Sequence, residues 1–175
     1  LLAEAGSAAH GVLEAAYGSA TCEQRVRLLT ILAKSLGKDS IAVFVHALLT
    51  PELTETAGRL LLGAAGQFQP ALQKLLRDGL GKHLEGPLPE ACLTQVITVL
   101  ARVDSAASRA TFVRFTAPTA PGSVRSAAFR ALCGSKLAAT QVTGMMELLE
   151  DLAQKDVHEA VREVLASLPE LPESL

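Results

Sequence analysis

The stretch PGSVRSAAFRALCG, residues 121–134, has the pattern of one amphipathic helix with a turn at each end. Arg125, Ala128 and Leu132 stand at offsets of three, four and seven, which place the three side chains on one helix face. The stretch also contains a second arginine, a cysteine and a single aromatic residue. It is therefore either part of a catalytic site or one unit of a repeating structure, and the rest of the chain favours a repeat.

The same spacing recurs along the chain when Leu132 is taken as an anchor position. Leucines follow one another at intervals of 30 to 38 residues, and the longest interval contains the loop GKHLEGPL, residues 81–88. We expect these anchors to be buried in one continuous core, because offsets of this kind keep residues on one face. They are Leu32, Leu62, Leu100, Leu132 and Leu165. The position seven residues before the anchor is polar in four of the five units, as Arg25, Glu55, Arg125 and His158.

The pattern predicts an all-α chain of ten helices that pair into five antiparallel hairpins, each with a first and a second helix. A single hairpin cannot bury its apolar face alone, so each should be stabilised by its neighbours. The expected helices are 1–17, 22–36, 40–49, 51–65, 70–80, 89–102, 105–116, 122–133, 139–153 and 156–168. We expect one helical-repeat domain over 1–175, with repeats at 1–37, 38–67, 68–103, 104–135 and 136–169, as a segment of a longer protein.

Helix start signals support these boundaries. Thr21 and Gln24 have the spacing of a capping box, and Asp156 with Glu159 has a similar form. Thr50-Pro51 offers a capping residue followed by a proline in the first turn, where a proline costs no hydrogen bond. The second helices of the first, second and fifth hairpins therefore begin with identifiable signals.

The composition agrees with packed helices. Apolar residues make up 49% of the 175 residues, whereas aromatic residues make up only 3%, so leucine and alanine must supply the core. A sheet would be richer in β-branched and aromatic residues. The 16 basic residues do not exceed the 18 acidic ones, so no excess charge is present to bind a phosphate backbone. No apolar run has the length of about 20 residues that a membrane-spanning helix needs.

Residues 123–132 resemble the start of the second helix in the HEAT-repeat family, through Ser123-Val124-Arg125, Ala128 and Leu132. Asp156-Val157-His158 follows the same pattern with histidine in place of arginine. The acidic residue that this family usually carries between its helices is missing before Val124, so an armadillo-like or irregular α-solenoid is an alternative. The resemblance implies a curved superhelix that binds other macromolecules, with the second helices on its concave side.

Four arginines on the expected second helices are the candidate partner-binding residues, because a guanidinium pairs well with carboxylates. They are Arg59, Arg102, Arg130 and Arg162. Of these, Arg102 and Arg130 are expected to face one groove from neighbouring repeats. Arg25 and Arg125, at the repeated first-turn position, are instead expected to make structural contacts between adjacent repeats. Glutamates on the same helices would make the groove mixed in charge.

The sequence offers no catalytic or metal-binding pattern. Its four histidines show no ligand spacing with one another or with a cysteine, and no base stands near a candidate nucleophile. Cys22 and Cys133 are expected to fill small apolar positions, and Met145-Met146 to fill the core. His46 is expected to be packed or at an edge. We therefore expect no enzyme activity, no cofactor and no metal.

The expected function is a non-catalytic scaffold that binds protein segments within a larger protein or complex. A nucleic-acid contact module of the helical-repeat type is the alternative, and a lipid-associated helical domain is a weaker one. Three widely separated cysteines argue against a disulfide framework, so an intracellular location, cytoplasmic or nuclear, is expected.

Overall fold

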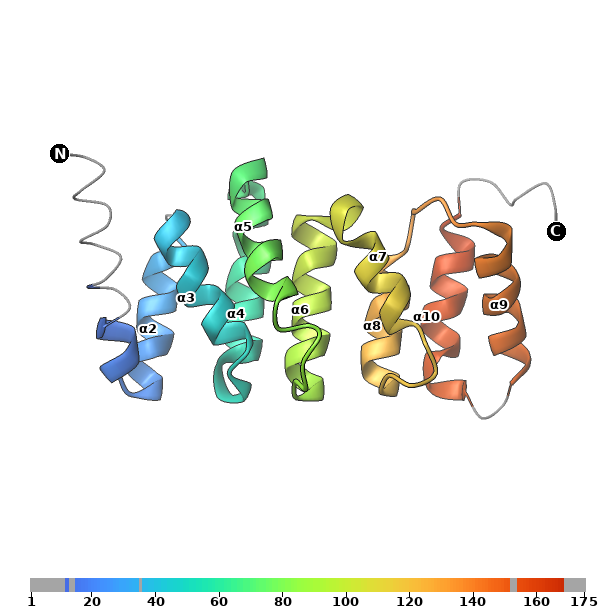
Figure 1. The fold of residues 1–175 in the computed structure, drawn as a ribbon, viewed down its shortest axis with the longest axis horizontal. Coiled ribbons are helices and arrows are strands. Elements are labelled where there is room, and N and C mark those ends of the chain that lie inside the picture. Colours follow the sequence, from blue (N-terminus) through green and yellow to red (C-terminus); the bar gives the residue numbers. More distant parts are fainter. Residues whose placement is uncertain (1–11, 13–14, 35, 152–153, 169–175) are drawn as a thin grey trace. The chain divides into compact units, whose positions relative to one another are not determined.

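The fold is known from a computed structural model that describes residues 12, 15–34, 36–151 and 154–168. Within these residues the regular structure is helical, which confirms the predicted all-α class. The first part of the helix predicted at 1–17 and the end of the one predicted at 139–153 lie outside the described residues. The helices pack mostly against their neighbours in the chain, in sequential pairs (Figure 1).

The chain divides into two compact units, residues 1–104 and 105–175. The boundary falls between the third and fourth predicted repeats. The first unit contains a helical segment at 15–19 and six labelled elements. These are α2 (Cys22–Leu32), α3 (Lys38–Leu48), α4 (Pro51–Gly63), the short 3-10 helix η1 (Ala65–Gln67), α5 (Pro70–Gly81) and α6 (Glu90–Val103). The second unit contains α7 (Ser105–Phe115), α8 (Gly122–Ala131), α9 (Ala139–Glu150) and α10 (Lys155–Ala166).

Second helices of successive hairpins pack extensively against one another inside each unit. In the first unit α4 packs against both α2 and α6, and in the second unit α8 packs against α10 (Figure 1). Ser126 of α8 donates a hydrogen bond to the carbonyl of Asp156 in α10, at 3.0 Å. Among first helices, α3 packs against α5. Within the predicted hairpins, α3 packs against α4, α7 against α8 and α9 against α10, which agrees with the predicted pairing.

The start of α2 confirms one predicted capping box. The Thr21 amide donates to Gln24 Oε1 at 2.8 Å, and the Gln24 amide donates to Thr21 Oγ1 at 3.4 Å. The cap predicted at Asp156 is wrong, because α10 begins one residue earlier, at Lys155, and Gln154 holds the cap position. The helix predicted at 22–36 also ends early, at Leu32.

The predicted burial of the anchor leucines is correct in three of the five predicted repeats. Leu32, Leu100 and Leu132 are buried, but Leu62 and Leu165 are only half-buried. In these two helices the neighbouring Leu61 and Val164 are fully buried instead. Adjacent residues are about 100° apart around a helix, and the apolar face of a packed helix is about that wide. Two adjacent apolar residues can therefore both fit the sequence pattern, although only one of them is fully buried.

Candidate functional site

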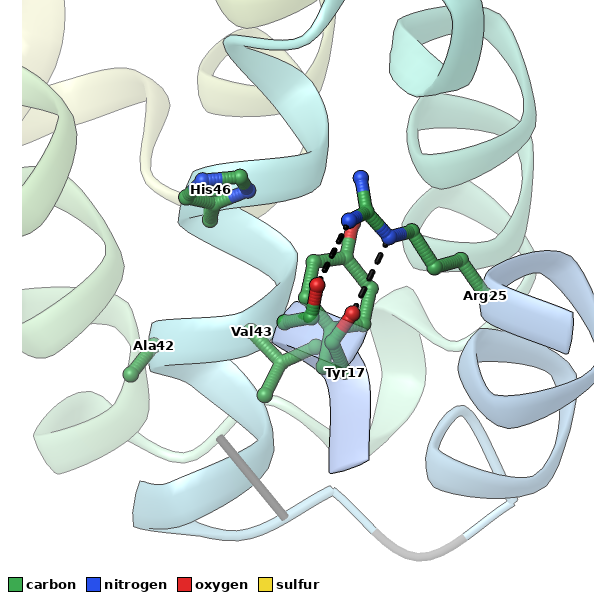
Figure 2. A pocket seen from close by; sticks show the side chains of 6 residues that line it. Tyr17, Arg25, Ala42, Val43 and His46 are labelled. Carbon is green, nitrogen blue, oxygen red and sulfur yellow. Dashed lines mark hydrogen bonds between the residues drawn. The ribbon is translucent and has the colours of Figure 1, made fainter. Parts of the chain in front are cut away.

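The first turns of the second helices carry side chains that bind the end of the preceding helix. Arg25 donates from Nε to the Tyr17 carbonyl and from Nη2 to the Gly18 carbonyl, both at 3.0 Å (Figure 2). In the fourth hairpin Arg125 donates from Nε to the Thr116 carbonyl, at 3.3 Å. Carbonyls at a helix C-terminus lack partners within the helix, and these contacts provide them with side-chain donors.

Two further residues make the same kind of contact. Thr54 donates from its hydroxyl to the carbonyl of Leu48, the last residue of α3, at 2.8 Å. His158 places its Nε2 at 3.0 Å from the carbonyl of Asp151, which follows α9. We call Arg25, Thr54, Arg125 and His158 the hairpin-closing residues. Glu55, predicted for this position in the second hairpin, is exposed, because the register there is shifted by one residue, as it is for Leu61.

Arg125 has a role between hairpins that was predicted, whereas the described contacts of Arg25 stay within its own hairpin. The Nη1 of Arg125 donates to Gln154 Oε1, just before α10, and the Arg125 side chain is buried. Arg25 is only half-buried, and its guanidinium lies over the Tyr17 ring at 5.1 Å from the ring centroid. The third hairpin has Leu93 at the corresponding position, where the loop at 82–89 separates α5 from α6.

The four candidate partner-binding arginines are all exposed, but their surroundings differ. Arg130 of α8 donates from Nε to Glu163 Oε2 at 2.9 Å and lies 3.8 Å from Glu159 Oε2, so its charge is partly balanced within the second unit. Among the described residues, Arg59, Arg102 and Arg162 have no ion-pair partner. Arg59 and Arg102 lie on α4 and α6, two helices that pack together. The predicted groove between Arg102 and Arg130 joins different units and stays a prediction.

The first unit contains a pocket of about 330 Å³ that the sequence did not predict. Its described lining comes from Tyr17, Gly18, Arg25, Ala42, Val43 and His46 (Figure 2). The ring centroids of Tyr17 and His46 are 5.6 Å apart in an edge-to-face arrangement. The Tyr17 hydroxyl is buried and has no hydrogen-bond partner among the described residues. Burial raises the pKa of this phenol above its usual value, although the Arg25 charge opposes the shift.

The second unit contains a more apolar pocket of about 310 Å³. Val113 of α7, Phe129 of α8 and Met145 of α9 are among its lining residues. Met145 is buried as predicted, whereas Met146 is half-exposed and does not fill the core. No charged side chain lines this pocket among the described residues, whereas Arg25 lines the pocket of the first unit.

The prediction that Cys22 and Cys133 fill small apolar positions is wrong. Cys22 and Cys133 are exposed, and only Cys92 is buried. Burial raises the pKa of the Cys92 thiol, an effect that a hydrogen bond with Thr54 opposes. A raised pKa lowers the thiolate fraction at neutral pH, so this side chain is a packing residue of the α4–α6 contact. His46 is exposed at the pocket edge, which agrees with the second of the two predictions for it, packed or at an edge.

The described residues contain no group of three or more histidine, cysteine or acidic side chains placed to hold a metal ion. No helix in the described part of the chain is long and apolar enough to cross a membrane. Comparison of the chain with protein-family models, with curated proteins and with solved structures gave no match.

Proposed function

We propose that this chain is a helical-repeat scaffold of the HEAT or armadillo-like type, which binds protein segments and has no catalytic role. The single observation that carries the proposal is the recurrence of the hairpin-closing contact in four hairpins. A contact that recurs at the same place in successive hairpins is expected of stacked repeats, because the repeats are built alike. Repeats of this kind present long surfaces suited to extended partners.

The second helices are the proposed binding surface. They carry Arg59 and Arg102, two exposed cations without an ion-pair partner among the described residues. A carboxylate of a partner can pair with such a guanidinium without first displacing an internal partner. Arg130 is also proposed to bind a partner carboxylate, but its ion pair with Glu163 would have to break first. The net charge of −2 gives no support to the alternative of nucleic-acid binding.

Reversing both free arginines is expected to weaken partner binding at least about tenfold, because two attractive contacts become repulsive. The variant is Arg59→Glu with Arg102→Glu, and binding is measured by quantitative capture of partners from lysate of cells that express the protein. The fold should be retained, since exposed substitutions usually cost little.

The matched control is Lys74→Glu with Lys82→Glu, which changes the net charge equally at two exposed positions on or next to α5. This control should bind like the wild type. Equal loss in both variants would show an effect of net charge alone, and retained binding in the Arg59 and Arg102 variant would exclude this surface.

A further inference from the structure

The Arg25 guanidinium is held in a fixed position by three contacts. Two carbonyls of the preceding helical segment accept hydrogen bonds from its Nε and Nη2. The guanidinium also lies over the Tyr17 ring in a cation–π contact. Figure 2 shows the guanidinium above the Tyr17 ring, with His46 across the pocket on α3. The Nη1 nitrogen has no hydrogen-bond partner among the described residues. A cation fixed in this way binds an oxygen acceptor with little loss of side-chain entropy.

The fourth hairpin contains a related arrangement, in which the arginine donates to one carbonyl at the end of the preceding helix and its Nη1 has an acceptor. There Arg125 Nη1 donates to the amide oxygen of Gln154, which stands four residues before the hairpin-closing His158. In the second hairpin the residue four before the hairpin-closing Thr54 is Thr50. Its shorter side chain donates instead to the His46 carbonyl, at 2.9 Å. Arg125 Nη1 therefore has an acceptor oxygen, although Arg125 Nη2 is buried without a partner among the described residues. The Nη1 of Arg25, where the pocket lies, has no such acceptor in the described part of the chain.

The charge in the pocket selects the kind of acceptor. Arg25 carries one positive charge and makes no ion pair with a described acidic residue. One carboxylate balances that charge, whereas a phosphate dianion would leave a negative charge uncompensated. The exposed His46 ring lies on the opposite wall and offers a nitrogen to the second carboxylate oxygen. Tyr17 lines the same pocket, and its hydroxyl is buried and has no hydrogen-bond partner among the described residues.

We propose that the pocket of Tyr17, Arg25 and His46 binds the carboxylate of an acidic side chain from a partner segment. This inference rests on the proposed scaffold function, because that function supplies the segment. The pocket would fix the position of one aspartate or glutamate, while the arginines of α4 and α6 bind elsewhere on the same unit.

The test is a titration of the protein with N-acetyl-glutamate amide, followed by the backbone amide NMR signals of Tyr17, Gly18 and His46 at constant ionic strength. We expect saturable shifts at these residues. N-acetyl-glutamine amide has the same shape without the charge and should bind at least about tenfold more weakly. N-acetyl-phosphoserine amide and free succinate should also bind more weakly than the capped glutamate.

The test variant is His46→Ala, since its side chain is exposed and does not close a hairpin. It should bind the capped glutamate about 3- to 10-fold more weakly, the range of one lost hydrogen bond. His83→Ala, at another exposed histidine, is the matched control and should bind like the wild type. Substitution of Arg25 is less informative, because it also removes the hairpin-closing contact.

Absence of saturable shifts, equal shifts with the glutamine amide, or unchanged affinity in His46→Ala would each overturn the carboxylate site. Tighter binding of phosphoserine amide would assign the pocket to phosphate, and tighter binding of succinate would assign it to a free small carboxylate; either result rejects the proposal. Capture of partners through Arg59 and Arg102 is measured separately. If that capture is found while the titration fails, only the pocket inference is wrong.

Discussion

Replacement of Leu132 by alanine is expected to lower the free energy of unfolding by about 2–5 kcal/mol, the range for large-to-small changes in packed cores. Leu132 is 1% exposed and follows directly after α8. The loss includes the transfer free energy of the removed atoms and the cavity that they leave. Because α8 packs most closely against α10, we expect hydrogen-exchange protection to fall in α10 as well as in α8. Chemical denaturation gives the magnitude.

Leu165→Ala is the matched control, because Leu165 has the same place in the repeated pattern but is only half-buried. Its cost should be clearly smaller. Equal costs at the two positions, or an unchanged stability of Leu132→Ala, would contradict the burial described for this helix row.

Enlargement of Ala128 to leucine is expected to cost about 1–3 kcal/mol, because extra methylene groups in a packed core force neighbouring side chains out of their preferred rotamers. Ala128 is fully buried on α8, the helix that packs against both α7 and α10. The small side chain lets these helices approach. The measurement is the midpoint and slope of urea denaturation.

Ala127→Leu is the control on the same helix, one residue away, where the side chain is half-buried. It should change stability by less than about 0.5 kcal/mol. An equal loss of stability at positions 127 and 128 would contradict the proposal that tight packing around Ala128 causes the loss.

The sequence was sufficient to predict the fold class and the pairing of helices, because helix faces recur at a regular interval. It was less reliable in choosing between adjacent apolar residues. In the run Leu60-Leu61-Leu62 every position is apolar, so only the contact with neighbouring helices shows that Leu61 is the buried one. The shift of one residue also explains why Thr54, and not Glu55, closes the second hairpin.

The pocket could not be predicted in the same way. Tyr17, Arg25 and His46 come from three different helical elements, and no local motif relates them. Arg25 was predicted to contact the adjacent repeat, whereas its described hydrogen bonds stay within its own hairpin. That its Nη1 has no partner among the described residues depends on the three-dimensional surroundings. Likewise, the ion pair of Arg130 with Glu163 joins residues from separate hairpins, so charge spacing alone did not distinguish this arginine from Arg59 and Arg102.

The central proposal is that partners bind along the second helices, and site-specific photo-crosslinking tests it most directly. A benzoylphenylalanine is placed either at Thr98, exposed on α6, or at Lys74, exposed on α5. We predict that position 98 cross-links to a captured partner and that this product is lost when Arg59 and Arg102 are changed to glutamate. Position 74 should give no such product. A cross-link from position 74 together with none from position 98 would contradict the proposal and assign binding to the first helices.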